Sequence, residues 1–363
     1  MHLGIIEIYE KNHHSMIFNW IKIANINSWN VTLFTTMDIY SNVKEYLNGL
    51  CHDVVIQKTI DIIFLDRVVF RKKNKIDSYL FLSLSKRPIP LLFFRIKGLF
   101  LGITVHNANA WFVKNTIRTP AHIIKRMVRE RLFRKAGFII VNNRSMMEYY
   151  FKKTSGEKPI CVVPFSLRRC SQKRIVSDRF TVVYPGTINT TRKRYDNFIN
   201  LALHNPEDRF ILLGEISVRA EDRVVYEKMM NVENIVLFGE YVPNREFESR
   251  MLSADVLFSE IVVDFKLSDF TETYGITKDT GISYLIAEYS IPCLLNSDFK
   301  NDSIVKSGNI YFNTFIDLQE KYLMIKNSDL SHYKDNIKKE AEKITVETIA
   351  KELKETFFAE IIK

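Results

Sequence analysis

A lysine, a threonine and a glycine stand together in the second half of the chain. Lys278, Thr280 and Gly281 come directly before an apolar run, which is the pattern of a helix N-terminus. The free backbone N–H groups of such a terminus, beside a lysine, suit an anion such as a diphosphate. Thr280 at this position also suits ordinary helix capping. The stretch therefore predicts either an anion site or a simple cap.

A second basic group follows a glycine turn. The strand-like run 180–185 ends at a Pro-Gly turn, which continues with Gly186 and Thr187 and leads through a polar loop into three cations, Arg192, Lys193 and Arg194. A glycine there lets the backbone approach a phosphate closely. The alternatives are a solvated basic loop and a plain strand-ending turn.

Histidines lie in two further places where strands are predicted to end. His106 and Asn107 follow an apolar strand-like run in the first half of the chain. His13 and His14 lie between the first predicted strand and the first predicted helix, on the side where an acceptor would bind. A buried structural histidine is the alternative for His106, and helix capping with exposed histidines is the alternative for the pair.

Length and composition limit the class of protein. The chain has 363 residues, enough for two domains, with 46% hydrophobic and 26% charged residues, as in globular proteins. The formal charge of +10 favours anionic partners. Four scattered cysteines lack metal-ligand spacing and indicate reduced thiols in a cytosolic compartment. The apolar stretch 79–105 contains four basic residues, so we expect no membrane span there. The N-terminus leads straight into the strand-like run "LGIIEIYE", so we expect no secretory signal.

Short apolar runs alternate with helix-period segments along the chain. The predicted strands are 3–9, 30–36, 53–56, 79–84, 99–105, 138–142, 160–163, 180–185, 209–213, 234–238, 255–258, 291–295 and 309–312. The predicted helices are 15–26, 40–49, 120–135, 145–154, 194–203, 219–231, 244–252, 281–289 and 333–361. This alternation predicts an α/β protein with two doubly wound parallel sheets. The expected division is a first domain 1–165, a linker 166–178, a second domain 179–332 and a helical tail 333–363.

Four segments together carry a family resemblance. In order, "RERLFRKAGFIIVNNRSMMEYYFKKTSGEKPICVVPFSL", "FTVVYPGTINTTRKRYDNFINLAL", "RFILLGE" and "NVENIVLFGEYVPNREFESRMLSADVLFSE" resemble the retaining, nucleotide-sugar-dependent GT-B glycosyltransferases of family 4. The resemblance covers 125–295 and is weak before residue 98. It implies a GT-B fold, two Rossmann-like domains with an interdomain cleft, and transfer without a metal or other cofactor.

The resemblance also implies roles for particular residues. Glu272 matches the acidic residue that contacts the donor sugar in the family, and the Tyr274-Gly275 pair follows it. The family's second glutamate is missing, and the turn with Lys278, Thr280 and Gly281 stands in that region. Arg192 or Lys193, with Lys278, would stabilise the departing diphosphate. His106 would lie near the donor sugar and acceptor. The turn that reads the base would be Glu240, Tyr241 and Val242, with a plain βα loop as the alternative.

The expected activity is sugar transfer from a nucleoside diphosphate to a glycan or polyprenyl-linked acceptor in surface polysaccharide synthesis. The alternatives are a catalytically inactive GT-B scaffold subunit and a nucleotide-sugar epimerase. Segment 114–135 carries eight Lys/Arg against one Glu. It predicts either a solvated face or contact with an anionic membrane surface. We expect a cytoplasmic protein, peripheral on the inner membrane face, and no nucleic-acid partner.

Overall fold

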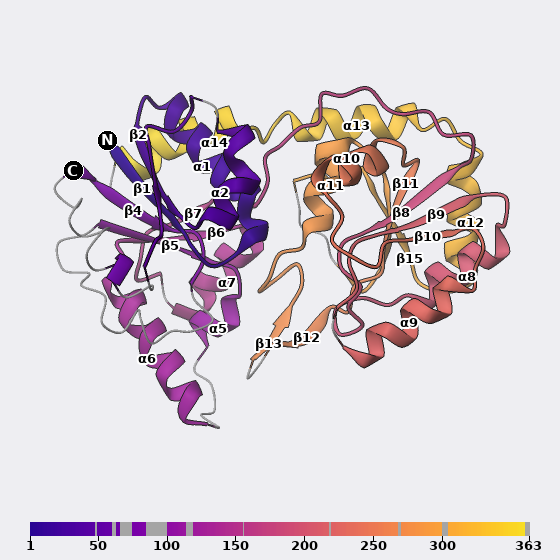
Figure 1. Cartoon of the computed structure of the whole chain (residues 1–363), viewed down its shortest axis with the longest axis horizontal. Coiled ribbons are helices and arrows are strands. Elements are labelled where there is room, and N and C mark those ends of the chain that lie inside the picture. Colours follow the sequence, from indigo (N-terminus) through magenta and orange to yellow (C-terminus); the bar gives the residue numbers. More distant parts are fainter. Residues whose placement is uncertain are drawn as a thin grey trace.

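Two α/β lobes lie side by side in the computed structural model (Figure 1). The structure describes residues 1–47, 49–59, 63–65, 75–84, 100–113, 119–154, 156–217, 219–267, 270–299 and 304–359. Parts of three predicted segments lie outside these residues. They are 85–99 of the apolar stretch, 114–118 of the basic segment and the last residues of the tail.

The first lobe is built on a parallel sheet with strand order β3-β2-β1-β4-β5-β6-β7. Its strands are β1 (His2–Glu7), β2 (Asn30–Thr35), β3 (Asp53–Ile56), β4 (Ser78–Phe81), β5 (Phe100–Val105), β6 (Phe138–Val141) and β7 (Ile160–Val162). Most of the strand side chains are buried, because helices cover both faces of such a sheet.

The second lobe repeats this design with strand order β10-β9-β8-β11-β14-β15. Its strands are β8 (Thr181–Pro185), β9 (Arg209–Leu213), β10 (Ile235–Leu237), β11 (Val256–Ser259), β14 (Cys293–Asn296) and β15 (Asn309–Phe312). Neighbouring strands within each of these two sheets run parallel throughout. The prediction of two doubly wound parallel sheets is confirmed, and each predicted strand is present to within a few residues.

Helices flank both sheets (Figure 1). In the first lobe they are α1 (His14–Ile26), α2 (Met37–Val43), α5 (Ala108–Phe112), α6 (Pro120–Lys135) and α7 (Arg144–Thr154), with 3-10 turns η1 (Lys11–His13) and η2 (Lys44–Tyr46). In the second lobe they are α8 (Asp196–His204), α9 (Ala220–Met230), α10 (Asn244–Leu252), α11 (Gly281–Tyr289) and α12 (Phe315–Lys326). The sequence prediction missed α5 and α12.

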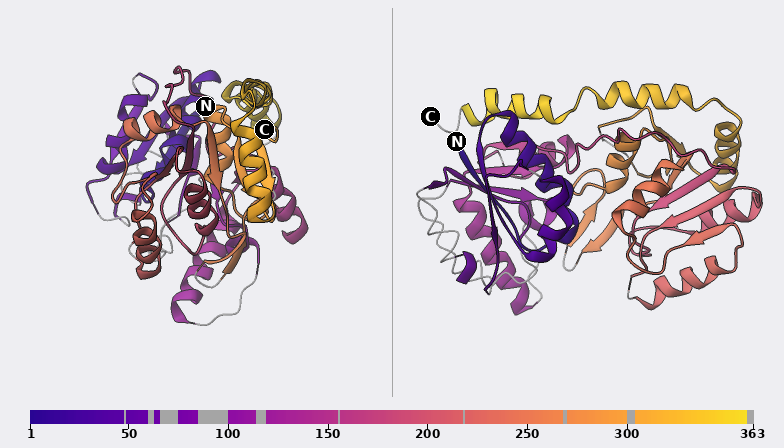
Figure 2. Two further views of the ribbon diagram at one scale, coloured as in Figure 1. Left: turned by 90° about the vertical axis from the view of Figure 1, so that its right-hand side faces the viewer. Right: turned by 45° about the horizontal axis from the view of Figure 1, so that its top comes forward.

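The C-terminal tail crosses from the second lobe back to the first (Figure 2). It is not one helix over 333–361, as predicted, but α13 (Ser331–Ala341), α14 (Val346–Glu352) and a π-helical turn, η5 (Leu353–Phe358). The break occurs because Thr345 caps α14 and forms a capping box with Thr348. Ile337 of α13 packs in the core of the second lobe, and Ile349 of α14 packs in the core of the first. The tail therefore holds the two lobes together.

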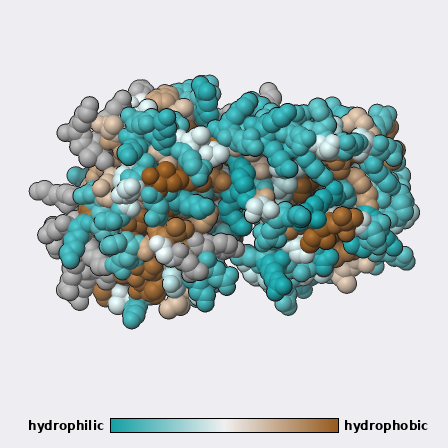
Figure 3. Space-filling model, turned by 90° about the horizontal axis from the view of Figure 1, so that it is seen from above, coloured by the Kyte–Doolittle hydropathy of each residue, from teal (hydrophilic) through white to brown (hydrophobic). Residues whose placement is uncertain are grey.

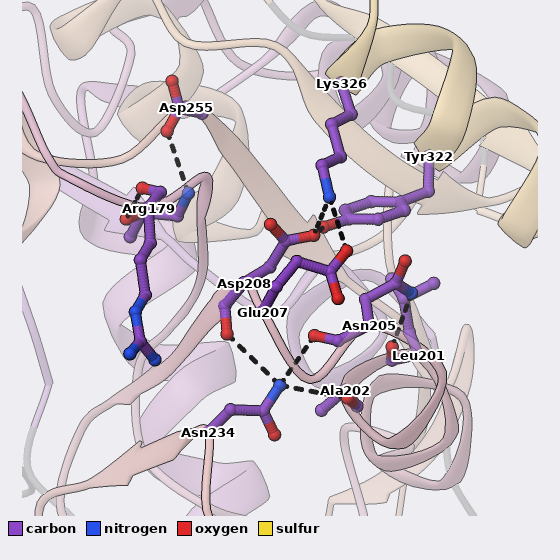
Figure 4. Close-up of polar contacts among 11 residues, drawn as sticks. Arg179, Leu201, Ala202, Asn205, Glu207, Asp208, Asn234, Asp255, Tyr322 and Lys326 are labelled. Carbon is purple, nitrogen blue, oxygen red and sulfur yellow. Dashed lines mark hydrogen bonds and ion pairs between the residues drawn. The ribbon is translucent and has the colours of Figure 1, made fainter.

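A polar network fixes α12 to the second sheet at the end away from the loops that follow β8 and β11 (Figure 4). Lys326 Nζ donates to Asp208 Oδ2 and to Glu207 Oε1, each at 2.7 Å, and the Tyr322 hydroxyl also donates to Asp208. Asn234 donates to the carbonyls of Ala202 and Asn205 nearby. These contacts lie at the amino end of β9, so they stabilise the lobe and leave the opposite edge for binding.

A hairpin unforeseen from the sequence joins the lobes. It consists of β12 (Asp264–Leu267) and β13 (Phe270–Thr273), paired antiparallel, and it extends from the second lobe toward α5 (Figure 1). The backbone N–H of Ala108 donates to the Thr277 carbonyl at 2.7 Å, and Asn109 Nδ2 donates to the Thr271 carbonyl at 2.7 Å. The hairpin and the segment after it thus form part of the contact between the lobes.

The outer surface over the tail helices is mainly hydrophilic, with separate hydrophobic patches on both lobes (Figure 3). No helix in the described part of the chain has both the length and the apolar content that crossing a bilayer requires.

Candidate functional site

A cavity of about 760 Å³ lies where the carboxyl ends of the two sheets meet. The first lobe lines it with residues that follow β1, β4, β5 and β6, and with the inner face of α6. The second lobe supplies the loop after β8, the hairpin and the start of α11. Its polar lining residues include Glu10, His13, Ser83, His106, Asn107, Asn142, Arg192, Lys278, Asp279, Thr280 and Tyr284.

The N-terminus of α11 opens onto this cavity. Thr280 is the N-cap residue, but its side chain makes no capping hydrogen bond. Gly281 also lines the cavity, and a Cβ added there would meet no atom within 4 Å. Simple side-chain capping by Thr280 is therefore not what the structure shows. Asp279 Oδ1 instead accepts from the Thr280 N–H at 2.8 Å, and the positive end of the helix dipole lies at the cavity lining.

Two cations from the second lobe reach the same cavity. Lys278 Nζ donates to Asn107 Oδ1 across the lobes at 2.8 Å. Burial, assisted by the charge of Arg192, lowers the pKa of Lys278 to about 8. Arg192 lies over the Phe265 ring of the hairpin, 5.4 Å from its centroid. The structure thus brings together one group of predicted residues: Lys278, Thr280, Gly281 and Arg192.

Lys193 is placed differently from Arg192. Its Nζ donates to the Pro185 carbonyl at 2.7 Å and lies 4.9 Å from the centroid of the Tyr184 ring. Burial and the neighbouring Arg192 lower the pKa of Lys193 to about 7. It is not among the residues that line the cavity. Contact between this amine and a bound ligand, as predicted, would require it to leave the carbonyl.

The glycine turn rests directly against Lys193. Gly186 has φ +91°, a backbone conformation that favours glycine, and a Cβ added there would lie 3.0 Å from Lys193 Nζ. Its N–H donates to the Leu213 carbonyl at 2.8 Å, which ties the turn to the end of β9. Gly186 and Thr187 do not line the cavity. They form the turn after β8 that precedes the cavity-lining Arg192.

Glu272 joins the two lobes. Its carboxylate is fully buried and accepts from the backbone N–H groups of Ala110 at 3.1 Å and Asn109 at 3.3 Å. These are first-turn donors of α5, so Glu272 of the second lobe caps a helix of the first. Burial raises the pKa of this carboxyl. Both oxygens accept from the α5 backbone and Glu272 does not line the cavity, so the contact with a donor sugar stays a prediction.

His106 lines the cavity, yet both ring nitrogens face groups of its own lobe. Its Nε2 lies 2.8 Å from the Leu82 carbonyl, which can only accept, and its Nδ1 lies 3.0 Å from the Asn142 amide. Burial, helped by the nearby His13, lowers the pKa of His106 to about 4. The neutral ring is thus held as a fixed wall of the site.

The neighbouring histidines His13 and His14 lie in different surroundings. His13 lines the cavity, and its Nδ1 lies 2.7 Å from Glu7 Oε2. His14 does not line the cavity, and its pKa is lowered to about 4 by burial, with Arg168 and His13 adding to the effect. Glu7 is a functional candidate that the sequence reasoning missed. The available signal was a carboxylate at the end of the first apolar strand.

The remaining predicted donor-binding residues lie outside the cavity. Glu240, Tyr241 and Val242 follow β10, two strands from β8 at the same sheet edge, with Tyr241 exposed and Val242 buried. Tyr274 stacks on Phe265 with ring centroids 4.8 Å apart. Gly275 takes φ +83° in the turn between the hairpin and α11.

Comparison with known proteins identifies the fold of this chain. No family model matches the chain. No curated protein matches it either. Solved structures do match over nearly the whole length. HepE from Anabaena, in complex with UDP and glucose, has a TM-score of 0.65 and 13% identity over 99% of this chain and 100% of that one.

Two further structures extend the comparison. A protein from Listeria monocytogenes described as a putative UDP-N-acetylglucosamine 2-epimerase has a TM-score of 0.62 and 11% identity, covering 99% of this chain and 96% of its own. A mutant O-GlcNAc transferase from Thermobaculum terrenum has a TM-score of 0.59 and 11% identity, covering 99% and 67%. At these identities the likeness concerns the fold alone. With the two parallel sheets and the cavity between them, it shows that this chain has the GT-B fold.

Proposed function

We propose that this chain is a glycosyltransferase that takes a sugar from a nucleoside-diphosphate sugar and transfers it to a glycan or polyprenyl-linked saccharide. One observation carries the proposal: Lys278, Arg192 and the N-terminus of α11, which the Thr280 side chain does not cap, meet in the cavity between the lobes. A diphosphate is the anion that this arrangement suits best, because it offers several oxygens to two cations and to backbone donors at once.

The same groups provide the catalysis. When the bond between the sugar and the diphosphate breaks, negative charge grows on the leaving oxygen. Fixed cations and helix N–H groups stabilise that charge more strongly in a partly dry cavity than in water. Lys193 acts indirectly in this proposal, because its hydrogen bond to the Pro185 carbonyl holds the turn at Gly186 in place. In this proposal the protein's own groups replace a metal ion, and no resident cofactor takes part.

The acceptor enters from the first lobe, near α6. The inner face of α6 adds Lys125, Val128 and Leu132 to the cavity wall. On its outer side Ile123 and Met127 are exposed, beside Arg126 and Arg134. We propose that this face rests on an anionic membrane surface where a lipid-linked acceptor is presented, as in surface polysaccharide synthesis on the cytoplasmic side.

Calorimetric titration with UDP, GDP and CMP tests the proposal, followed by incubation with UDP-glucose and UDP-N-acetylglucosamine. We expect one nucleotide to bind, and its sugar donor to be consumed with release of the nucleotide. Epimer formation without nucleotide release would identify an epimerase instead. Binding without turnover would indicate an inactive scaffold subunit, and binding of none of the three would contradict the proposed function.

A further inference from the structure

A histidine and a buried carboxylate form a pair on the wall of the cavity, and the proposed charge stabilisation does not use them. His13 lies in η1 directly after β1, and Glu7 is the last residue of β1. His13 Nδ1 and Glu7 Oε2 are 2.7 Å apart. The exposed fraction is 13% for the His13 side chain and 0% for that of Glu7.

Glu7 is held firmly as an ionised acceptor. Its Oε1 accepts from Ser83 Oγ at 2.5 Å and from the backbone N–H groups of Tyr9 at 3.0 Å and Glu10 at 3.1 Å. Burial alone would raise the pKa of Glu7, but the hydrogen bonds from His13, Ser83 and Tyr9 outweigh it and leave the pKa below its ordinary value. A carboxylate in this state can only accept, so Nδ1 of His13 carries the proton.

This tautomer leaves the lone pair of His13 on Nε2. Within the described residues Nε2 has no hydrogen-bond partner, and the ring lines the cavity. The ring is fixed on two further sides, by His106 with centroids 4.8 Å apart and by Phe165 at 5.4 Å. A ring held in a fixed orientation on a cavity lining, with an unpaired ring nitrogen and a carboxylate on its other nitrogen, is the geometry of a general base.

We infer that His13 is the general base that deprotonates the acceptor hydroxyl, with Glu7 as its positioning residue. The inference rests on the proposed glycosyl transfer. His13 Nε2 takes the hydroxyl proton while the acceptor oxygen bonds to the anomeric carbon of the donor. The bond from that carbon to the diphosphate oxygen breaks, and its electron pair leaves with the nucleoside diphosphate. The proton on His13 then passes to solvent.

This assignment has a stereochemical consequence. A base that activates the acceptor for direct attack opposite the leaving group inverts the anomeric carbon. The resemblance to family 4 implies retention, so the two lines of reasoning give opposite expectations. An α-linked donor such as UDP-glucose should give a β-configured product.

Water serves as a test acceptor because no natural acceptor is needed to observe its reaction. The assay measures UDP release from UDP-glucose and from UDP-N-acetylglucosamine, and early NMR spectra identify the first anomer released. His13→Gln should slow release by about 10²- to 10⁴-fold, the usual contribution of general base catalysis. The UDP affinity of His13→Gln should stay within about threefold of the wild type, because the residues that bind the diphosphate lie on the other lobe. Glu7→Gln should lower the rate without weakening UDP binding.

His332→Gln on α13 is the matched control, since His332 is exposed and contacts Asn336 far from the cavity. Thermal melts of wild type and His13→Gln establish whether the variant is folded before its rate is interpreted. Unchanged release by a folded His13→Gln protein, or α-glucose as the first product, would overturn the assignment while leaving the proposed transfer in place. Wild-type protein that binds UDP but forms an epimer would overturn it as well. Failure of the wild type to bind any nucleotide would instead remove the proposed function on which it rests.

Discussion

Replacing Glu272 with alanine should loosen the contact between the two lobes. The side chain accepts two backbone hydrogen bonds from the first turn of α5, at Ala110 and Asn109, and lies within the field of Lys278. Loss of a helix cap costs about 0.5–2 kcal/mol. Leaving buried donors unpaired costs about 1–3 kcal/mol. These costs overlap, and removing a poorly solvated carboxylate offsets part of them. The expected net loss is therefore about 1–3 kcal/mol.

The assay is guanidinium unfolding of the full chain, followed by small-angle scattering of the native protein. Glu272→Ala should unfold at lower denaturant and show a larger radius of gyration, because the hairpin no longer holds α5. Glu272→Gln keeps one acceptor oxygen, so its unfolding concentration and radius of gyration should lie between those of the wild type and of Glu272→Ala. Glu233→Ala is the matched control, because Glu233 is exposed and makes no hydrogen bond or ion pair with any described residue.

Two outcomes would refute this reasoning. One is a Glu272→Ala protein that unfolds at the same denaturant concentration as the wild type and the Glu233→Ala control. The other is normal stability with complete loss of donor turnover, which would return Glu272 to the sugar-contacting role implied by the family resemblance.

Two further predictions concern charge. At pH 8 Lys278, with a pKa of about 8, is half protonated, and a bound diphosphate raises that pKa, so UDP binding should take up about half a proton. Titrations in two buffers of different ionisation enthalpy measure this uptake, and a binding enthalpy that does not depend on the buffer would contradict it. On α6, replacing Arg126 and Arg134 with glutamate should reduce flotation with vesicles that contain anionic lipid and leave donor turnover in solution unchanged. Equal recovery of wild type and variant would exclude an electrostatic contribution from this face.

The sheets were predictable because their strands are uninterrupted apolar runs. Residues 138–142 and 209–213 contain little else, and such runs between helical segments point to buried parallel strands. The β12–β13 hairpin had no such signal. Its strands are only four residues long, β13 contains a single apolar residue, and contacts with α5 of the other lobe support the hairpin. Partners that lie about 160 residues away leave no local pattern.

The site was predictable only where strand ends determine it. Arg192 lies after β8, and Lys278 lies in the longer segment that follows the neighbouring strand β11; the carboxyl ends of such parallel strands meet at one edge. The direction in which a side chain points could not be predicted from the strand ends. Lys193 and Arg192 are neighbours in sequence, yet one donates to the Pro185 carbonyl and the other faces the cavity. The burial of Glu272 against α5 depends on how the lobes pack, which no local spacing records.

The binding of UDP to the wild type and to Lys278→Met shows whether the diphosphate lies between Lys278, Arg192 and α11. A hydrogen bond from a charged group contributes about 1.5–3 kcal/mol. We therefore expect Lys278→Met to bind UDP about 10- to 150-fold more weakly than the wild type. The exposed Lys228 on α9 provides the control, and Lys228→Met should bind UDP like the wild type. Equal affinity in all three proteins would show that the diphosphate does not bind between Lys278, Arg192 and α11.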